Sequence, residues 1–276
     1  MKHAHIAFIG GGNMATSLIA GLIADGYEPQ RLIVSDPDPD KAAALAARFG
    51  VRIADSNAAA AAEADTLVLC VKPQIAPAVC RALADLLGAR VSLVISVMAG
   101  IREAAIASWL GVSLPIVRAM PNTPAMLQAG AIGLHASPQV DATQRNQAET
   151  ILRAVGMARW VADEDMIDAV TAISGSGPAY FFLLMETLEQ AAVDLGLSAE
   201  DARLLTIQTA LGAARMAIEG GDSPAVLRAR VTSPGGTTEA ALKVFASGGF
   251  GELVAEATVA ARQRAIELSD QLTEQS

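Results

Sequence analysis

The sequence predicts an α/β fold with a doubly wound parallel sheet over residues 1–163, followed by an all-α region over residues 164–276. Short β-branched runs alternate with Ala-rich runs of helical period up to about Val161, and after Asp163 only helical patterns remain. Charge divides at the same place. Lys+Arg against Asp+Glu is 13 against 13 in the first region and 7 against 16 in the second, so the net charge of -9 lies entirely in the helical region.

Five near-continuous apolar runs in the first region are typical of strands covered by helices on both faces. They span residues 5–10, 31–36, 66–71, 92–97 and 115–120, and weaker strands are predicted over 131–135 and 159–161. Apolar residues at helical spacing predict helices over 13–25, 40–49, 75–87, 102–110 and 141–155, with an Ala-rich helix after Asn57.

The second region reads as successive helices over 178–195, 198–219, 223–230, 237–245 and 251–272. Ser198 and Ser223 are the predicted N-caps, and Pro178 and Pro224 fall at first-turn positions that tolerate proline.

Composition excludes several classes of protein. A net charge of -9 without a Lys or Arg cluster argues against nucleic acid or an anionic membrane as partner. Cys70 and Cys80 form no CxxC pair, which argues against a disulfide scaffold or a metal site. The apolar N-terminal stretch contains three consecutive glycines and Asn13, unlike a signal peptide, and no other segment has about 20 apolar residues free of Gly, Pro and charge. We therefore expect a cytoplasmic protein with no membrane partner.

The strongest local motif is Gly10-x-Gly12-x-x-Ala15, which directly follows a predicted strand and opens a predicted helix. The first glycine permits a tight turn, the second lets a pyrophosphate approach the backbone, and Ala15 permits close packing of helix on strand. A glycine-rich turn without a ligand is the alternative. The context favours a Rossmann-type dinucleotide site with the phosphates at the helix N-terminus.

Further candidates follow other strands at the same edge of the sheet. Asp36 ends the second strand, where a carboxylate accepts a ribose 2′-hydroxyl and repels a 2′-phosphate; alternatively it caps the next helix. Lys72 follows a later strand and either lines the cofactor cleft or is a solvated lysine. Asn57 either caps the Ala-rich helix or touches the cofactor.

Two glycine-rich segments of the helical region, residues 174–180 (SGSGPAY) and 232–238 (TSPGGTT), each precede a predicted helix. Each is either a structural loop or a set of free backbone N–H groups that holds a substrate carboxylate. The helical region has no His and a single lysine, Lys243. A hydride acceptor such as a protonated cyclic imine would not require a strong acid or base, and a hydroxyl that orients its nitrogen could suffice.

The combination of IGGGNMA, VKP, MAG, RAMPNTP, DAVTAISGSGPAYFF and VTSPGGTT resembles the pyrroline-5-carboxylate reductase family over essentially the whole chain. This resemblance implies reduction of 1-pyrroline-5-carboxylate to L-proline with NADPH or NADH, the last step of proline biosynthesis. It also implies that the C-terminal region is a dimerisation domain that forms helix-swapped homodimers, which often assemble further into decamers.

The resemblance assigns site residues as well. With Asp36 from the strand-end argument, the predicted cofactor-binding residues are Gly10, Gly11, Gly12, Asn13, Met14, Ser35, Asp36, Asn57, Val71, Lys72, Met98 and Ala99. The predicted substrate-binding residues are Glu164, Ser233, Gly235, Gly236, Thr237 and Thr238, and Thr238 is the predicted catalytic hydroxyl. No metal is predicted.

Asp36 departs from the family pattern, because members often have a small hydroxyl residue there that suits the NADPH phosphate. We therefore expect NADP as cofactor, with NAD as a second possibility. Two other functions fit parts of the sequence: a 3-hydroxyacid dehydrogenase, for which Lys243 is the one candidate acid in the helical region, and a non-catalytic nicotinamide sensor.

Overall fold

The computed structural model describes residues 4–84, 87 and 91–274, which form two compact units. The first unit comprises Met1–Ser176 with Ala261–Ser276, and the second comprises Gly177–Ala260. The predicted functional boundary after residue 163 stays a prediction. The compact units divide later because Glu164 bonds to Arg118 of the sheet and Leu272 packs against the core of the first unit.

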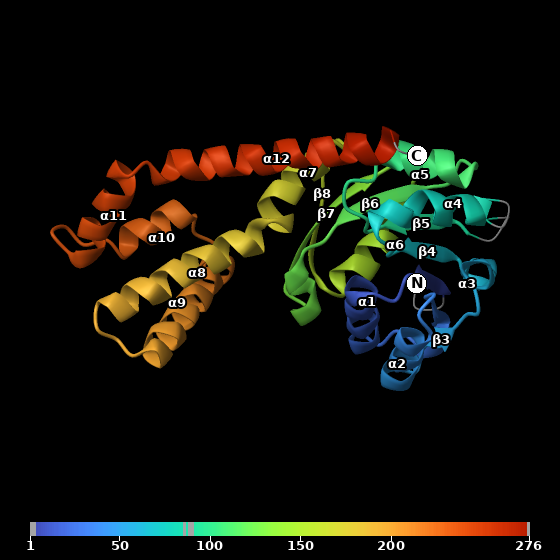
Figure 1. The fold of residues 1–276 in the computed structure, drawn as a ribbon, viewed down its shortest axis with the longest axis horizontal. Helices are drawn as coiled ribbons and strands as arrows, with labels where there is room; N and C mark the ends of the chain where they lie inside the picture. Colours follow the sequence, from blue (N-terminus) through green and yellow to red (C-terminus); the bar gives the residue numbers. More distant parts are fainter. Residues whose placement is uncertain (1–3, 85–86, 88–90, 275–276) are drawn as a thin grey trace. The chain divides into compact units, whose positions relative to one another are not determined.

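The first unit is built on an eight-stranded sheet in the order β3-β2-β1-β4-β5-β6-β7-β8 (Figure 1). Neighbouring strands are parallel except β6 and β7, which are antiparallel because only a short 3-10 helix, Thr123–Leu127, lies between them. The doubly wound sheet is confirmed, and the short strand β3 and the antiparallel turn were not predicted. The strands are β1 Ile6–Ile9, β2 Leu32–Ser35, β3 Arg52–Ile53, β4 Thr66–Leu69, β5 Leu93–Ser96, β6 Ile116–Met120, β7 Gly130–Ala136 and β8 Gly156–Trp160.

Helices cover both faces of this sheet, and each face has its own core. On one face α1, α2 and α6 bury residues such as Leu18 against Phe8. On the other, α3, α4 and α5 bury residues such as Ile106 against Leu67. The helices are α1 Asn13–Ala24, α2 Pro39–Phe49, α3 Asn57–Glu63, α4 Ala76–Ala84, α5 Glu103–Leu110 and α6 Ala142–Arg153. The predicted helix 75–87 includes residues 85–86, which lie outside the described residues.

A short helix, α7 (Met166–Val170), continues as a π-helical turn, Thr171–Gly175. The prediction of a glycine-rich loop from residue 174 is therefore wrong. The Ser176 N–H donates to the Thr171 carbonyl at 2.8 Å, and the Ser174 carbonyl accepts from the Asn122 side chain at 2.9 Å. Because these backbone groups have protein partners, this segment offers less free backbone to a ligand than a loop would.

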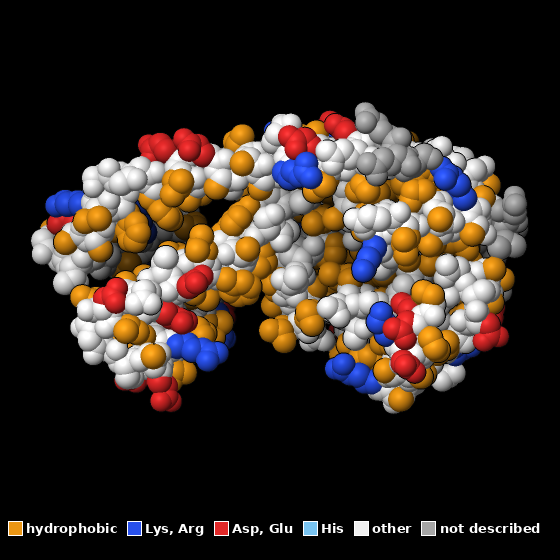
Figure 2. Space-filling model, viewed as in Figure 1, with side chains coloured by type: hydrophobic (Ala, Val, Ile, Leu, Met, Phe, Trp, Pro, Cys, Tyr) orange, Lys and Arg blue, Asp and Glu red, His pale blue; other side chains and the backbone are white. Residues whose placement is uncertain are grey.

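The second unit consists of helices: α8 Gly177–Asp194, α9 Ala199–Glu219, α10 Pro224–Arg230, α11 Thr237–Ser247 and the first part of α12 Phe250–Glu274. The predicted N-caps are confirmed, since Ser198 Oγ accepts from Asp201 N–H and Ser223 Oγ from Val226 N–H. Many large apolar side chains of this unit are exposed, including Phe181 and Phe182 at 64% and 63%, and Figure 2 shows hydrophobic side chains on its surface.

By length and composition alone, one continuous helix among the described residues, Met166–Asp194, is long and apolar enough to cross a membrane. Only 22% of its most apolar window is buried. Within this run the π-helical turn ends at Gly175, and α8 begins at Gly177 with Pro178 in its first turn. Its exposed apolar surface needs a partner, and a bilayer is one kind of partner while a second protein chain is another.

Candidate functional site

The glycine loop turns the chain from β1 into α1. Gly10 has φ of +99°, and a Cβ there would lie 2.8 Å from the Cys70 carbonyl oxygen, so this turn requires glycine. Gly12 is the N-cap residue of α1 and has no side chain to occupy the helix N-terminus. A Cβ on Gly12 would meet no atom within 4 Å, and both Gly12 and Asn13 are exposed. This open helix end fits a pyrophosphate, which the N-terminal N–H groups and the helix dipole would stabilise.

The Asp36 carboxylate holds that loop in place through hydrogen bonds to backbone N–H groups. Its Oδ2 accepts the Gly11 N–H at 2.7 Å, and its Oδ1 accepts the Asp38 N–H at 2.9 Å. The alternative that Asp36 caps α2 is wrong, because Asp38 is the N-cap and accepts from Asp40 and Lys41 N–H. Each Asp36 oxygen can still accept a further hydrogen bond from a ribose hydroxyl. Its charge, together with that of Asp38 and Asp40, disfavours a phosphate at the same place.

Ser35 and Asn57 pair with each other. Ser35 is buried at the end of β2 and its hydroxyl donates to Asn57 Oδ1 at 2.8 Å. The N-cap of α3 is Ser56, whose hydroxyl accepts the Ala59 N–H, so the alternative that Asn57 caps this helix is wrong. Asn57 instead lies half-buried in the first turn of α3, where its amide links that helix to the end of β2.

The loops after β4 and β5 contain the remaining predicted cofactor residues. Val71 is half-buried and Lys72 exposed, and Met98 is buried beside the exposed Ala99. Parallel β1, β2, β4 and β5 end at one edge of the sheet, which brings these loops to the side where open α/β folds bind nucleotides. The structure thus gathers the predicted cofactor residues at the carboxyl edge of this sheet.

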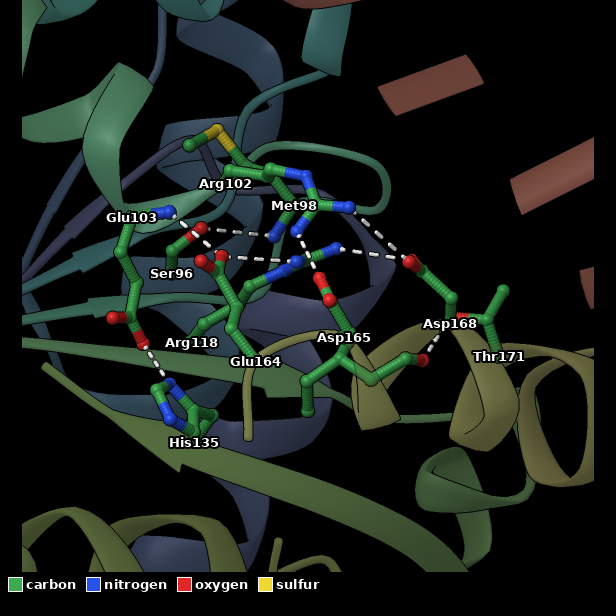
Figure 3. Close-up of polar contacts among 11 residues, drawn as sticks. Ser96, Met98, Arg102, Glu103, Arg118, His135, Glu164, Asp165, Asp168 and Thr171 are labelled. Atoms are coloured by element: carbon green, nitrogen blue, oxygen red, sulfur yellow. Dashed lines mark hydrogen bonds and ion pairs between the residues drawn. The ribbon is translucent and has the colours of Figure 1, made fainter. Parts of the chain in front are cut away.

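A cluster of charged side chains lies beside the β5–α5 loop (Figure 3). Arg118 of β6 is fully buried, and its guanidinium lies between the carboxylates of Glu164 at 3.0 Å and Asp168 at 3.7 Å. Arg102 bonds to Asp165 at 2.6 Å and approaches Asp168 at 3.5 Å. Buried charges persist only when they are paired in this way.

Burial and ion pairing shift the pKa values of the acidic side chains in this cluster in different directions. Desolvation raises the pKa of Asp168 against the opposing pull of Arg118 and Arg102. Desolvation also raises the pKa of Glu103, although the imidazole of His135 at 2.7 Å opposes this. Asp165 is exposed, and its hydrogen bond from Arg102 lowers its pKa.

Sequence reasoning assigned a site role to Glu164 and missed its partners. An available signal was the single charged residue inside the apolar strand run 115–120. The described residues contain no group of three or more His, Cys, Asp or Glu side chains that could hold a metal. A cavity of about 250 Å³ beside the cluster, lined in part by Glu103 and Glu164, is small against the size of ordinary cofactor pockets.

In the second unit, the predicted substrate loop leads into α11. Gly235 has φ of +73°, and Gly236 is the N-cap residue, again without a side chain to fill the helix end. The Gly236 N–H donates to the Ser233 carbonyl at 3.0 Å, and the Gly235 N–H donates to Glu239 Oε2 at 2.8 Å.

Backbone N–H groups of the first turn of α11, at Thr237 and Thr238, therefore remain the candidates for binding an anion. Lys243, the candidate acid of the dehydrogenase alternative, has a 72% exposed side chain and lies 3.3 Å from Glu239. The Glu239 carboxylate thus contacts both the glycine loop and the sole lysine of the helical region.

A doubly wound sheet with this glycine turn and an open α1 N-terminus is typical of dinucleotide-binding proteins. Residues 5–100 match the family model "NADP oxidoreductase coenzyme F420-dependent", and residues 164–268 match "Pyrroline-5-carboxylate reductase dimerisation".

Similar proteins cover the whole chain. Pyrroline-5-carboxylate reductase of Pseudomonas aeruginosa is 54% identical over 99% of both chains. A solved pyrroline-5-carboxylate reductase from Coxiella burnetii superposes with a TM-score of 0.93 at 51% identity, covering 96% of this chain and 98% of that one. The Plasmodium falciparum pyrroline carboxylate reductase, solved with NADP bound, has a TM-score of 0.85 at 28% identity, covering 98% and 99%. The chain belongs to the pyrroline-5-carboxylate reductase family.

Proposed function

We propose that this protein reduces 1-pyrroline-5-carboxylate to L-proline with NADPH or NADH, the last step of proline biosynthesis. The observation that carries the proposal is the 54% identity to the Pseudomonas aeruginosa reductase over 99% of both chains. The glycine loop and the TSPGGTT segment, which the sequence singled out, each lead into a helix whose N-cap residue is a glycine.

The cofactor is a nicotinamide dinucleotide, and when bound it supplies a hydride. Support comes from the NADP oxidoreductase match over residues 5–100 and from the NADP bound to the Plasmodium relative. The open end of α1 fits the pyrophosphate, and Asp36 fits a ribose hydroxyl. Under this proposal the gathered residues at the carboxyl edge, from Gly10 to Met14 and on to Ala99, contact the dinucleotide.

The substrate carries a ring imine and a carboxylate, and we assign both to the loop before α11. The N–H groups at the start of α11 and the Ser233 hydroxyl hold the carboxylate. The Thr238 hydroxyl orients the ring nitrogen, which carries a proton in the iminium form. Hydride adds to the imine carbon and the nitrogen keeps its proton, so the product is the secondary amine proline. Orientation alone accounts for much of the rate under this scheme.

We also propose that the protein works as a homodimer formed through the second unit, and that these dimers assemble further into decamers. The dimerisation model covers residues 164–268, which include α8 and its exposed Phe181 and Phe182. A second copy covering these side chains explains why an apolar helix of this length is left bare in one chain. The free thiols of Cys70 and Cys80 fit the predicted cytoplasmic location.

The test incubates the purified protein with 1-pyrroline-5-carboxylate and NADPH or NADH, and follows both loss of the reduced nicotinamide and formation of proline. We expect stoichiometric conversion. Lys243→Ala is the control, because the reductase should keep its activity without this exposed lysine. Failure to form proline with either cofactor would refute the proposal, and loss of all activity in Lys243→Ala would favour the hydroxyacid dehydrogenase.

A further inference from the structure

Arg118 is a charged side chain at a position where an apolar side chain would pack equally well. It is the largest fully buried side chain among the described residues, at 1% exposure in β6. Burying a guanidinium is unfavourable unless carboxylates pair with it, and an apolar side chain would fill the same core without that requirement. Here Glu164 and Asp168 supply the pairing, at 3.0 and 3.7 Å.

Glu164 connects this pair to the start of α5. The same Oε1 atom that accepts from Arg118 also accepts the Glu103 N–H at 2.8 Å. Arg102, the N-cap residue of α5, directs its own side chain to Asp165 instead. The Glu164 carboxylate therefore takes the place of a capping side chain, where the helix dipole favours a negative charge.

The loop between β5 and α5 is consequently held at both ends. At its beginning the Met98 N–H donates to Ser96 Oγ at 3.3 Å. At its end the Arg102 side chain bonds to Asp165, and the next N–H, that of Glu103, bonds to Glu164. Figure 3 shows Met98 joined to Ser96 at the start of this segment, and Arg102 and Glu103 joined to Asp165 and Glu164 at its end. In a doubly wound sheet this loop lies over the half of the cleft that receives the second nucleotide of a dinucleotide.

We propose that Arg118 and Glu164 are positioning residues that fix the Met98–Ala99 segment for the nicotinamide, so that Glu164 acts through the loop and not by contact with the substrate. This inference rests on the proposed function. It also reassigns Glu164, for which the family resemblance implied a role in the substrate pocket. A pair that only stabilises the fold would leave the loop free of both residues, whereas here one carboxylate oxygen contacts the guanidinium and the loop end together.

The experiment compares Glu164→Ala with Glu164→Gln. Glutamine keeps an oxygen that can accept the Glu103 N–H, and alanine removes it. We expect Glu164→Ala to lower kcat about tenfold and to raise the Kd for NADPH several-fold, with the KM for 1-pyrroline-5-carboxylate changed less than about twofold, because misplaced reactants lose orientation. Glu164→Gln should recover most of the NADPH affinity.

A second readout is the primary isotope effect with NADPH deuterated at the transferred position. A nicotinamide held loosely should slow hydride transfer itself, so the isotope effect on kcat should increase in Glu164→Ala. If Glu164 served global stability alone, Glu164→Ala would change the melting temperature and leave the isotope effect on kcat unaltered. The matched control is Glu63→Ala, since Glu63 forms an exposed ion pair with Arg52 in the same unit, at 2.6 Å.

Direct titration of NADPH by its fluorescence separates failure of this inference from failure of the proposed function, because it needs no turnover. Weakened NADPH binding in folded Glu164→Ala, restored in Glu164→Gln, supports the inference even if another substrate is reduced. A raised KM for 1-pyrroline-5-carboxylate with unchanged kcat and isotope effect would overturn it and place Glu164 against the substrate. Unchanged parameters in both folded variants would also overturn it.

Discussion

The two units of this chain bury apolar residues in different ways. In the first, each face of the sheet has its own core, and residues such as Phe8 and Leu18 are fully buried. In the second, large apolar side chains such as Phe181, Phe182 and Leu204 are 64%, 63% and 59% exposed. One unit completes its core within a single chain, whereas the other presents the kind of apolar surface that obligate partners cover.

The largest effect should come from charging the exposed apolar face. Phe181→Glu/Phe182→Glu should weaken self-association by more than about 4 kcal/mol, because large aromatic side chains dominate interface energies. Light scattering coupled to size exclusion measures the loss of the dimer. Glu200→Lys on α9 is the matched charge-changing control. A dimer that persists in the double variant would show that these residues do not form the interface.

The next largest effect should come from a substitution that creates a cavity in the core of the first unit. Leu18→Ala removes a fully buried side chain and should lower the free energy of unfolding by about 3 kcal/mol at any protein concentration. Leu204→Ala, made in the monomeric double variant, should cost less than about 1 kcal/mol because that side chain is already exposed. Denaturant titration measures both changes in the free energy of unfolding. Equal losses in the two variants would contradict the difference in burial between the units.

A third prediction tests the assignment of one reactant to each unit, the imine substrate to the second unit and the dinucleotide to the first. Thr238→Ala should lower kcat by about 30-fold, about 2 kcal/mol, because it removes the hydroxyl that orients the acceptor nitrogen. The Kd for NADPH should stay within about twofold, since the dinucleotide is assigned to the first unit. Steady-state kinetics and fluorescence titration check the two values, and a fall in NADPH affinity would mean that the loop binds the cofactor.

Cofactor choice is a smaller effect within the first unit. Asp36→Ser should raise the ratio of kcat/KM for NADPH over NADH about tenfold, about 1.4 kcal/mol, because a carboxylate no longer faces the 2′-phosphate. Asp40→Asn removes a nearby exposed charge and should change the ratio less than about threefold, since exposed charges are screened. An unaltered ratio in Asp36→Ser would show that Asp36 serves only as the brace of Gly11.

The smallest effect concerns pH. A carboxyl whose pKa is raised on folding binds its proton more tightly in the native state, so its contribution to stability declines as pH rises above its ordinary pKa. Asp168 has such a raised pKa. Between about pH 4 and about pH 7 the free energy of unfolding of wild type should therefore fall relative to that of Asp168→Asn. Urea titrations across this range would contradict the prediction if the difference stayed constant.

The sequence predicted the strands, most helices and the glycine turn, because these depend on local periodicity and on residues close together in the chain. It did not predict that Arg118 pairs with Glu164, since these residues are 46 positions apart and their contact depends on the sheet. The sequence offered Asp36 and Asn57 only as alternative caps and missed Asp38 and Ser56, because Asp, Asn and Ser all favour such positions and only geometry selects among them.

The end of α12 bears on how the chain folds during synthesis. Ser269 and Leu272 lie against Gly100 in the β5–α5 loop, where a Cβ on Gly100 would be 3.3 Å from Leu272 Cδ1. These residues leave the ribosome after the whole second unit has been made. The nucleotide-binding unit thus cannot complete its packing co-translationally before the dimerising helices emerge, even though domains ordinarily fold in order from the N-terminus. Ribosome-bound chains that stop before residue 261 should bind NADPH more weakly than the released protein.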